Sequence, residues 1–480
     1  MKKAFSKKNL WDTIPHSFRI TLGTGLGIFH PKWLLGKNFR QNLRFADNTQ
    51  YWPEEFLRVY QLNELRMILK LAFENCKFYR CLFDSVGFHP KDIKTLDNIS
   101  QLPTIEKQSV IDNLSNMCTK NITAIDVDYG STSGTGGKPL NFYMNADRSP
   151  KEYGYLVTSW KRAGYKLGMP MAVLRGRVVS PDRNGLHHEY DPILHHHHYS
   201  SFHMSDENMA RYLEHITTIG ECFLHTYPST VNVLARFILR KGINTPKNIK
   251  GVITESEIVY PEQRQLVEEV FGCRYFSCYG HSEKLVLAAG CEKSADYHVW
   301  PTYGYFELLD DDGNPVNTPG QRGEIVGTGF INTIMPFIRY RTGDWATYVG
   351  NHCDACGRKH TIIREIRGHR IQEVLITTDC SEISWTALNM HDDTYLNVRQ
   401  FQFRQEKPGQ AVLRIVPTDE FGKDDADRIQ RNLGRKLDGK LSFTIELVEA
   451  IPLSARGKAI YVDQQIQQEK RDSLKSEGNI

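Results

Sequence analysis

The stretch MPFIRYRTGDWA, Met335 to Ala346, sets two arginines and the carboxylate of Asp344 directly after the apolar run MPFI. Taken alone, it has an ordinary interpretation, because an aspartate in a Thr-Gly-Asp turn can simply pair with Arg341 at the protein surface. The stretch indicates a fold only together with other segments that occur in a fixed order along the chain.

The first of these segments is the loop DYGSTSGTGGKPLNF, residues 128–142, which is almost free of apolar side chains between Gly130 and Lys138. Its backbone amides and hydroxyls could converge on an anion, because glycine lets the backbone approach a ligand closely. The loop does not match the G-x-x-x-x-G-K-[ST] phosphate loop, since Pro139 follows the lysine. Taken alone, the segment fits either a different phosphate loop or a flexible linker.

Three further segments complete the order. CYGHSEKLVLA sets Glu283 just after a Tyr279-Gly280 turn, REIRGHRIQEVLI follows Asp344, and IPLSARGKAI sets Lys458 on a glycine-flanked loop. Each segment has a plain interpretation by itself, because surface carboxylates and solvated lysines are common. Their joint order is improbable by chance.

The composition is that of an ordinary globular protein: 480 residues, 40% hydrophobic and 24% charged, which predicts two or three domains. A net charge of +4 over this length predicts no nucleic-acid partner. We expect no membrane-spanning helix, because no run of about 18 apolar residues occurs, and no signal peptide, because the lysine-rich start lacks a small-residue cleavage site. The ten cysteines are too sparse for a disulfide scaffold, so we expect reduced thiols and a cytoplasmic protein.

The pattern of apolar residues predicts an α/β (α+β) protein of two domains. Helices are expected from Asn63 to Cys81 and from Asp206 to Ile216, and a hairpin from Tyr303 to Phe330. Past residue 370 the chain alternates a strand (QAVLRIVP), a helix (ADRIQRNLGRKL) and a strand (SFTIELVEAI). We therefore predict a large N-terminal domain, residues 1–370, and a small C-terminal α+β domain, residues 371–480.

Two residue pairs suggest a metal centre. Cys291 and His298 are close in sequence, and Cys353 and Cys356 form a C-x-x-C followed by Gly357. The glycine suits a zinc knuckle, in which the turn points backbone amides at thiolate sulfur, and four soft N and S ligands make a tetrahedral structural zinc site plausible. The alternative is four groups without a shared metal.

A histidine-rich stretch is a second candidate for metal binding, comprising His187, His188 and His195 to His198. Consecutive residues in a loop cannot all face one ion. This interpretation is therefore disfavoured.

The ordered segments resemble the adenylate-forming superfamily of acyl and aryl ligases. Within it they resemble the phenylacetate-CoA ligase type, especially the CapK-like branch found with surface-polysaccharide genes. The resemblance extends from QLPTIEKQSVIDN at Gln101 to GKAIYVDQ at Gly457. Its motifs are similar to the Ser/Thr/Gly phosphate loop at residues 131–139, YGxTE at 279–283 with serine for threonine, YRTGD at 340–344 unchanged, and the closing GK at 457–458. The segment RGHRIQE departs from the usual hinge sequence, and Arg456 stands where a small residue is common.

The resemblance implies an ATP-dependent carboxylic acid ligase, an acid–thiol ligase with a mobile C-terminal lid. The acid would attack the α-phosphate of ATP, pyrophosphate would leave, and the acyl group would pass from the adenylate to a thiol. That thiol would belong to coenzyme A or to the phosphopantetheine of an acyl carrier protein, and the lid would rotate between the two steps. The substrate would be a small carboxylic acid used in capsule or O-antigen polysaccharide biosynthesis, bound along residues 224–230 and 277–288.

The resemblance also implies a role for each motif residue. Lys138 would hold the β- and γ-phosphates, Glu283 would hold Mg²⁺, and Asp344 would accept hydrogen bonds from the ribose hydroxyls. Lys458 would bridge the substrate carboxylate and the α-phosphate in the first step only. Residues 256–257 resemble the segment beside the adenine. The expected nucleotide contacts are Ser131, Thr132, Ser133, Gly134, Thr135, Gly136, Gly137, Ser256, Glu257, Tyr279, Gly280, His281, Ser282, Asp344 and Arg370.

Two other functions compete with the ligase. A zinc-containing nucleic-acid binder built on the C-x-x-C is disfavoured by the weak net charge. A non-catalytic nucleotide-binding relative that acts as a partner in polysaccharide assembly would be expected to lose Lys458 or Glu283, and the sequence has both.

Overall fold

The computed structural model is an α/β structure, as the sequence predicts. It describes residues 23, 25–119, 127–132, 140–182, 184–368, 374–384, 388, 390, 393–395, 397–452 and 461–466. The chain divides into two compact units: unit 1 comprises Met1–Gly130, Asn141–Gly168 and Phe276–Gly368, and unit 2 comprises Ser131–Leu140, Met169–Tyr275 and His369–Ile480. Among the described residues, no helix combines the length and the hydrophobicity needed to cross a membrane.

The helices of unit 1 come mainly from its N-terminal third. They are α3 (Pro31–Leu34), α4 (Gly36–Thr49), α5 (Glu54–Asn75), α6 (Lys77–Ser85), α7 (Lys107–Asp112) and α8 (Arg148–Lys161), with short 3₁₀ turns at Pro90–Asp92 and Leu96–Gln101. Helix α8 packs closely on α4, because a Cβ at Gly154 would lie 2.8 Å from the backbone nitrogen of Leu43. The helix predicted from Asn63 to Cys81 is instead two helices. Cys76 has extended backbone angles (φ −111°, ψ 120°), which end α5 and begin α6.

The sheet of unit 1 contains seven strands in the order β11-β12-β13-β14-β10-β9-β8, and every neighbouring pair is antiparallel. The strands are β8 (Arg274–Gly280), β9 (Leu287–Gly290), β10 (Tyr297–Val299), β11 (Gly304–Leu309), β12 (Arg322–Gly329), β13 (Tyr340–Gly350) and β14 (Ile362–Arg367). The predicted hairpin is confirmed as β11 and β12. Strands β1 (Val127–Thr132) and β2 (Leu140–Asn145) form a separate two-stranded sheet.

Glycines in β11 and β12 let the segment after Glu283 lie directly against this hairpin. A Cβ at Gly304 would lie 2.0 Å from the carbonyl oxygen of Leu285, and one at Gly327 would lie 2.9 Å from the Cβ of the same leucine. Both separations are shorter than real side chains tolerate. The sequence therefore needs glycine here so that the turn between β8 and β9 can pack on the hairpin.

Unit 2 contains a second sheet, with the order β7-β6-β3-β5-β4. Strand β3 pairs parallel with β5 and β6, and β6 pairs parallel with β7, whereas β4 pairs antiparallel with β5 at the edge. The elements are β3 (Met171–Leu174), β4 (His188–Asp191), β5 (His196–Tyr199), α9 (Asp206–Thr218), β6 (Cys222–Thr226), α10 (Pro228–Lys241), β7 (Ile249–Thr254) and α11 (Pro261–Phe271). The predicted helix from Asp206 to Ile216 is confirmed as α9, and the Ser205 hydroxyl caps its first turn by accepting from the Asn208 amide.

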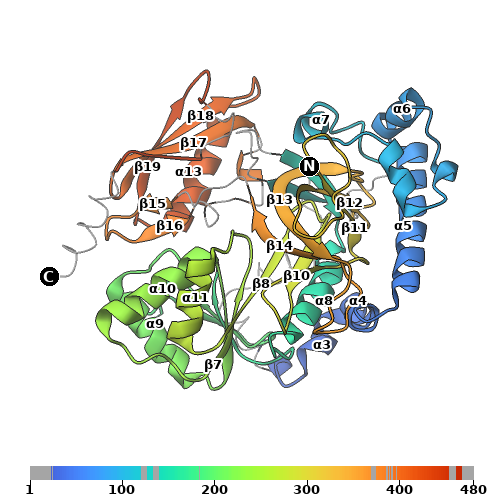
Figure 1. Ribbon diagram of the computed structural model, residues 1–480. Coiled ribbons are helices and arrows are strands. Elements are labelled where there is room, and N and C mark those ends of the chain that lie inside the picture. The colour runs from blue at the N-terminus through green and yellow to red at the C-terminus, as the bar shows by residue number, and fades with distance from the viewer. Residues whose placement is uncertain are drawn as a thin grey trace. The chain divides into compact units, whose positions relative to one another are not determined.

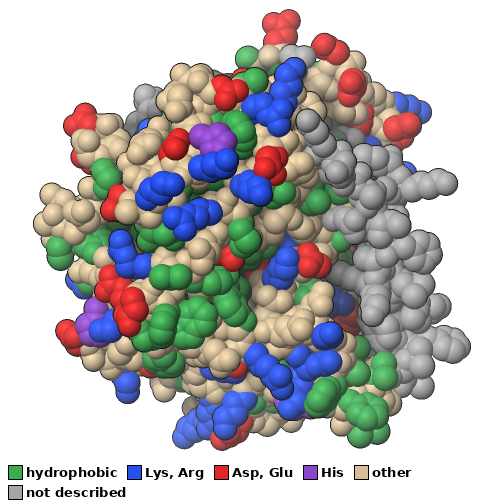
Figure 2. Space-filling view, turned by 90° about the vertical axis from the view of Figure 1, so that its right-hand side faces the viewer, with side chains coloured by type: hydrophobic (Ala, Val, Ile, Leu, Met, Phe, Trp, Pro, Cys, Tyr) green, Lys and Arg blue, Asp and Glu red, His purple; other side chains and the backbone are tan. Residues whose placement is uncertain are grey.

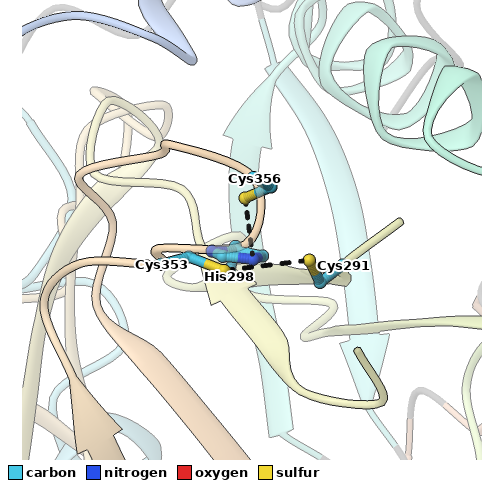
Figure 3. A group of neighbouring side chains, drawn as sticks. All are labelled: Cys291, His298, Cys353 and Cys356. Carbon is cyan, nitrogen blue, oxygen red and sulfur yellow. Dashed lines mark hydrogen bonds between the residues drawn. The ribbon is translucent and has the colours of Figure 1, made fainter. Parts of the chain in front are cut away.

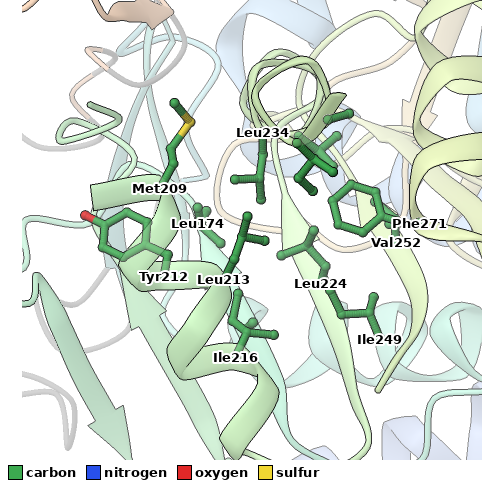
Figure 4. Close-up of a cluster of buried hydrophobic side chains, with 14 of the residues drawn as sticks. Leu174, Met209, Tyr212, Leu213, Ile216, Leu224, Leu234, Ile249, Val252 and Phe271 are labelled. Atoms are coloured by element: carbon green, nitrogen blue, oxygen red, sulfur yellow. The ribbon is translucent and has the colours of Figure 1, made fainter. Parts of the chain in front are cut away.

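The helices α9, α10 and α11 lie side by side (Figure 1) and bury a single apolar cluster with the strands. Figure 4 shows Leu213 of α9 and Leu234 of α10 pointing toward Leu224 of β6. All five residues of β6, CFLHT, are buried, as expected for a parallel strand inside a sheet, where the sequence is largely apolar rather than alternating.

The C-terminal part of unit 2 is a small α+β fold. Its four-stranded sheet has the order β19-β18-β17-β20, with β17 (Val398–Lys407), β18 (Gln410–Pro417), β19 (Ser442–Leu447) and β20 (Val462–Gln464). The remaining elements are α13 (Lys423–Leu437), the hairpin of β15 (Val374–Ile376) with β16 (Glu382–Ser384), and a 3₁₀ turn at Asp393–Tyr395. The predicted strand, helix and strand are therefore confirmed. The predicted boundary at residues 370 and 371 lies outside the described residues.

Charged side chains of both signs are interspersed on the face that Figure 2 displays. This mixture fits the near balance of 60 Lys and Arg with 56 Asp and Glu in the whole sequence. On the described part of this face, no continuous basic track of the kind that follows a nucleic-acid backbone is visible.

Candidate active site and metal centre

Two of the sequence motifs meet in unit 1 through Tyr279 and Asp344. Tyr279 lies near the end of β8 and Asp344 near the start of β13, and the tyrosine hydroxyl donates to Oδ2 of the aspartate at 2.9 Å. The same hydroxyl lies 2.6 Å from Nε2 of His281. Because the single phenolic proton goes to the carboxylate, His281 must donate from Nε2. The three side chains therefore form one hydrogen-bonded chain that ends on the aspartate.

Burial keeps two members of this chain neutral. It raises the pKa of Tyr279 well above its ordinary value, and the charge of Asp344 raises it further. Burial, followed by the nearby charge of Lys284, lowers the pKa of His281 to about 3. At neutral pH the Asp344 carboxyl group thus accepts from a neutral phenol, which in turn accepts from a neutral imidazole.

The backbone around Asp344 is fixed by its own turn. Its amide donates to the Thr342 hydroxyl at 3.1 Å, and the Gly343 amide donates to Glu324 at 2.9 Å. Gly343 has a φ of +75°, a conformation that favours glycine. Arg341 donates from Nε to Glu324 at 2.8 Å. Arg341 therefore stabilises the turn by binding Glu324 of β12. The ordinary interpretation of the stretch had instead paired Arg341 with Asp344.

Glu283 lies half-buried in the turn between β8 and β9. The next residue, Lys284, has a positive φ of 61° and forms an ion pair with Glu152 of α8 at 2.7 Å, which fixes the turn. After burial, the charges of Glu283 and Asp344 are the main causes that raise the pKa of Tyr340. The two carboxylates of the separate motifs therefore lie near the same phenol.

Ser256 and Glu257 lie in unit 2, in the loop between β7 and α11. The Glu257 carboxylate accepts from the Ser229 amide at 2.8 Å and from its hydroxyl at 3.0 Å, at the N-terminus of α10. Ser256 has a positive φ of 74°, and its hydroxyl accepts from Nη2 of Arg175 at 2.7 Å. Glu257 thus has a structural role in capping a helix, which the sequence motif does not indicate.

A buried network holds the Ser256 loop, and sequence reasoning missed it. Arg175 donates to Glu255 at 2.8 Å and lies 3.0 Å from Nε2 of His225, with its guanidinium over the ring of Tyr227. Burial by itself raises the pKa of the Glu255 carboxyl, but Arg175 and His225 lower it to a net value below the ordinary one. In the sequence, only Glu255 beside Ser256 pointed to this network. Its partners His225 and Arg175 are distant in sequence, in β6 and just after β3.

The predicted cysteine and histidine ligands do come together, in unit 1. The ligand atoms of Cys291, His298, Cys353 and Cys356 all lie within 4.8 Å of one another. Figure 3 shows that the four side chains converge from three segments: the end of β9, strand β10 and the turn after β13. The Cys291 and Cys353 sulfurs are 4.0 Å apart, and the Cys356 sulfur lies 3.6 Å from Nε2 of His298.

These separations fit a tetrahedral zinc ion. Zn–S and Zn–N bonds of about 2.3 and 2.05 Å imply S···S and S···N separations of about 3.8 and 3.6 Å in a tetrahedral site. The Lys293 amide donates to the Cys291 sulfur at 3.3 Å, and Gly357 has a φ of +79° in the turn after Cys356. Burial raises the pKa of the Cys291 thiol, but amides of residues 293 and 294 lower it below the ordinary value. The knuckle geometry expected from the C-x-x-C-G sequence is therefore present.

Buried arginines surround this cluster. Arg358 forms a two-pronged ion pair with Glu292 at 2.7 and 2.6 Å. Arg162 lies over the ring of Trp300, and its Nε and Nη2 are buried without a hydrogen-bond partner among the described residues. Burial and the charge of Arg358 lower the pKa of Arg162 to about 10, so it stays protonated. A zinc ion with three thiolates and one imidazole carries a net charge of −1, which Arg162 would balance.

Several predicted site residues cannot be placed. Ser131 and Thr132 belong to strand β1, and only their backbone is described. The others lie outside the described residues: Ser133, Gly134, Thr135, Gly136, Gly137, Lys138, Arg370 and Lys458.

Comparison with known proteins agrees with the resemblance seen in the sequence. Residues 375–465 match the CapK C-terminal domain. The chain is 24% identical to protein CapK of Staphylococcus aureus over 85% of this chain and 91% of that protein. It is 27% identical to a phenylacetate-coenzyme A ligase of Pseudomonas putida over 60% and 66% of the two chains, and 24% identical to one of Thermus thermophilus over 70% and 75%.

Solved structures of 2-hydroxyisobutyryl-CoA ligase have the same fold. One in the thioesterification state, with 2-HIB-AMP and CoA, gives a TM-score of 0.56 at 19% identity and covers 89% of this chain and 94% of that one. One in the postadenylation state, with R3-HIB-AMP, gives 0.55 at 18% identity and covers 89% and 93%.

The relatives, together with the shared fold, support an AMP-forming acid–thiol ligase of the adenylate-forming class. Within this class the chain is a homologue of CapK and of the phenylacetate-CoA ligases. The predicted resemblance is therefore confirmed.

Proposed function

We propose that the chain activates a small carboxylic acid with ATP, releases pyrophosphate, and transfers the acyl group from the adenylate to a thiol. The observation that carries this proposal is the hydrogen bond from Tyr279 to Asp344, because it joins the YGxTE-like motif to the YRTGD motif. A carboxylate at Asp344 would suit the two hydroxyls of a ribose, because it accepts hydrogen bonds at two oxygens and donates none.

The phosphate chemistry needs positive charge around a site that holds two carboxylates. Glu283 would hold Mg²⁺, a hard cation that binds one or two carboxylates together with phosphate oxygens. Magnesium would supply charge neutralisation for the triphosphate. Lys138 and the loop 131–137 would hold the β- and γ-phosphates, and Lys458 would bridge the attacking carboxylate and the α-phosphate.

The acceptor proposed here is the thiol of coenzyme A or of the phosphopantetheine arm of a carrier protein. Support comes from structures with a similar fold, in which 2-hydroxyisobutyryl-CoA ligase is bound to 2-HIB-AMP and to CoA. We further propose a role in surface-polysaccharide biosynthesis, by analogy with the CapK branch. A reaction that consumes ATP and a free thiol fits the cytoplasm.

We also propose that Cys291, His298, Cys353 and Cys356 bind a structural zinc ion. The donor set, the separations and the buried Arg162 charge support this site. The zinc would join the strands that carry the active-site motifs and would take no part in the chemistry.

The test is ATP–pyrophosphate exchange with a panel of aryl, fatty, hydroxy and amino acids. Exchange that depends on one acid is expected from the wild type. Glu283→Gln and Asp344→Ala should abolish most of the exchange while leaving the far-UV circular dichroism spectrum unchanged. A chain that binds ATP, measured by calorimetry, but exchanges with no acid would favour the alternative, a non-catalytic nucleotide-binding partner.

A further inference from the structure

Unit 2 contains a group of three histidines away from the motifs considered above. Strand β4 pairs antiparallel with β5, so that His188 lies opposite Tyr199 and Tyr190 lies opposite His197. Because side chains alternate between the two faces of a strand, His188 and His197 share one face and lie diagonally across it. The neighbouring His196 and His198 point to the other face. Strand geometry therefore selects only part of the histidine-rich stretch.

The third histidine comes from a helix that covers this face. His215 lies in the last turn of α9, and its ring centroid is 4.3 Å from that of His188 and 5.8 Å from that of His197. It lies one turn along from the buried Tyr212, on the helix face that packs on the strands. The three rings thus come from three different elements of unit 2.

The nitrogen atoms of the three rings are placed as metal ligands would be. One ligand nitrogen from each ring lies within 4.8 Å of the others, and His188 Nε2 is 3.1 Å from His197 Nδ1. Two imidazole nitrogens bound to one tetrahedral zinc ion are about 3.3 Å apart, given Zn–N bonds of about 2.05 Å. The His188–His197 separation is close to this value, and small rotations of the His215 side chain would bring its nitrogen into the same range.

A neighbouring side chain already orients one of the rings. His215 Nδ1 is 2.7 Å from the hydroxyl of the buried Tyr199, which leaves Nε2 as the ring nitrogen that could bind a metal. Metal-bound histidines in proteins commonly have their second ring nitrogen fixed in this way. The carboxylate of Asp182 lies within electrostatic range of His188 and His215 and would offset part of the charge of a cation.

We propose that His188, His197 and His215 form a binding site for a divalent late first-row transition metal ion, with Zn²⁺ as the expected occupant. Three imidazole nitrogens without thiolate or carboxylate suit Zn²⁺, Ni²⁺ or Cu²⁺, and they leave a fourth position for water. The metal joins the edge hairpin of β4 and β5 to α9. This site is independent of the cysteine cluster in unit 1, which has a different donor set.

The experiment measures metal content in the full-length protein after equilibration with Zn²⁺ and removal of loosely held ions. His197→Ala and His215→Ala should each hold one zinc ion fewer per chain than the wild type. His195→Asn is the matched control, because His195 belongs to the same stretch but not to the cluster, and its φ of +59° suits asparagine. The control should hold as much zinc as the wild type.

A second measurement guards against variants that lose zinc because they unfold. Circular dichroism should be unchanged, and Co²⁺ added to the metal-free wild type should give two sets of bands, one with sulfur-to-cobalt charge transfer and one without it. The His215→Ala variant should lose only the second set. Equal zinc content in the wild type and both histidine variants would overturn the proposal, and so would loss of both sets of bands together in a folded His215→Ala variant.

Discussion

The hydroxyl of Tyr279 donates to the carboxylate of Asp344 across 65 positions of sequence. Tyr279→Phe removes this hydrogen bond and leaves the Nε2 proton of His281 without its acceptor. Because a hydrogen bond to a charged group contributes about 1.5–3 kcal/mol, we expect adenylate formation to fall roughly 10-fold to 100-fold. Pyrophosphate exchange at saturating acid measures the loss. The control is Tyr348→Phe, in the strand β13 that carries Asp344, and this variant should keep the wild-type rate. An unchanged rate in Tyr279→Phe would remove Asp344 from the proposed nucleotide site.

Lys458 is expected to act in only one of the two half-reactions. Lys458→Ala should slow adenylate formation roughly 100-fold to 1000-fold, the usual loss of one preorganised charge donor. Transfer from a supplied acyl adenylate to the thiol should keep its rate, because the lid would have rotated by then. The exposed Lys423, at the start of α13, provides a control by substitution with alanine. Equal losses in both half-reactions would contradict a mobile lid.

The cysteine cluster should hold one zinc ion per chain. Changing Cys353 and Cys356 to serine should remove this ion and lower the melting temperature, because structural metal binding contributes to folding. Metal analysis and thermal unfolding measure the two effects. Arg162→Gln should keep the ligands but weaken zinc retention against a chelator about 10-fold to 100-fold, as expected when the surroundings of a metal change. Full retention in the cysteine variant would exclude the site.

The acid stability of the protein should depend on His281. Its pKa is about 3 in the folded chain and about 6.5 when unfolded, so the unfolded state binds more protons between these values. Above pH 6.5 the titration of His281 does not change the free energy of unfolding. Below pH 6.5 it lowers that free energy by about 1.4 kcal/mol per pH unit. Urea unfolding between pH 6.5 and 4.5 should therefore show a shallower pH dependence in His281→Gln. The control His89→Gln, at an exposed histidine, should keep the wild-type pH dependence. If His281→Gln also keeps it, His281 must be exposed to water in the folded protein.

Two strand glycines should differ sharply in their tolerance of alanine. Gly304→Ala sets a Cβ against the carbonyl of Leu285 and should destabilise the protein by about 1–3 kcal/mol. Gly350→Ala meets nothing within 4 Å and should change stability by less than about 0.5 kcal/mol. Denaturant unfolding compares the two. Similar values for both variants would mean that the turn after β8 can move away without cost.

Local patterns in the sequence predicted several elements well. The hairpin of β11 and β12 and the strand, helix and strand of the C-terminal part follow from short-range alternation and turn residues, which need no knowledge of distant partners. The cysteine cluster was also predictable, because ligand pairs with knuckle spacing are local. The helix break at Cys76 was not, because its residues continue the helical apolar spacing on both sides.

The side-chain networks needed long-range pairing that periodicity does not encode. His215 joins His188 and His197 only because α9 covers one face of β4 and β5. Arg175 reaches Glu255 because β3 and β7 flank β6 in a parallel sheet. The order of the strands decides both contacts, and a single sequence does not reveal that order without a solved relative.

The cysteine cluster lies where two strands end that lead away from Glu283 and Asp344, the carboxylates of the proposed active site. From the Glu283 turn, β9 runs to Cys291, and from Asp344, β13 runs toward Cys353. If the proposed zinc ion joins these strand ends, an oxidant that forms a disulfide between Cys353 and Cys356 would remove two of its four ligands and loosen that connection. The proposed nucleotide site, which has no cysteine among its predicted residues, would thereby become sensitive to oxidants through the proposed zinc site.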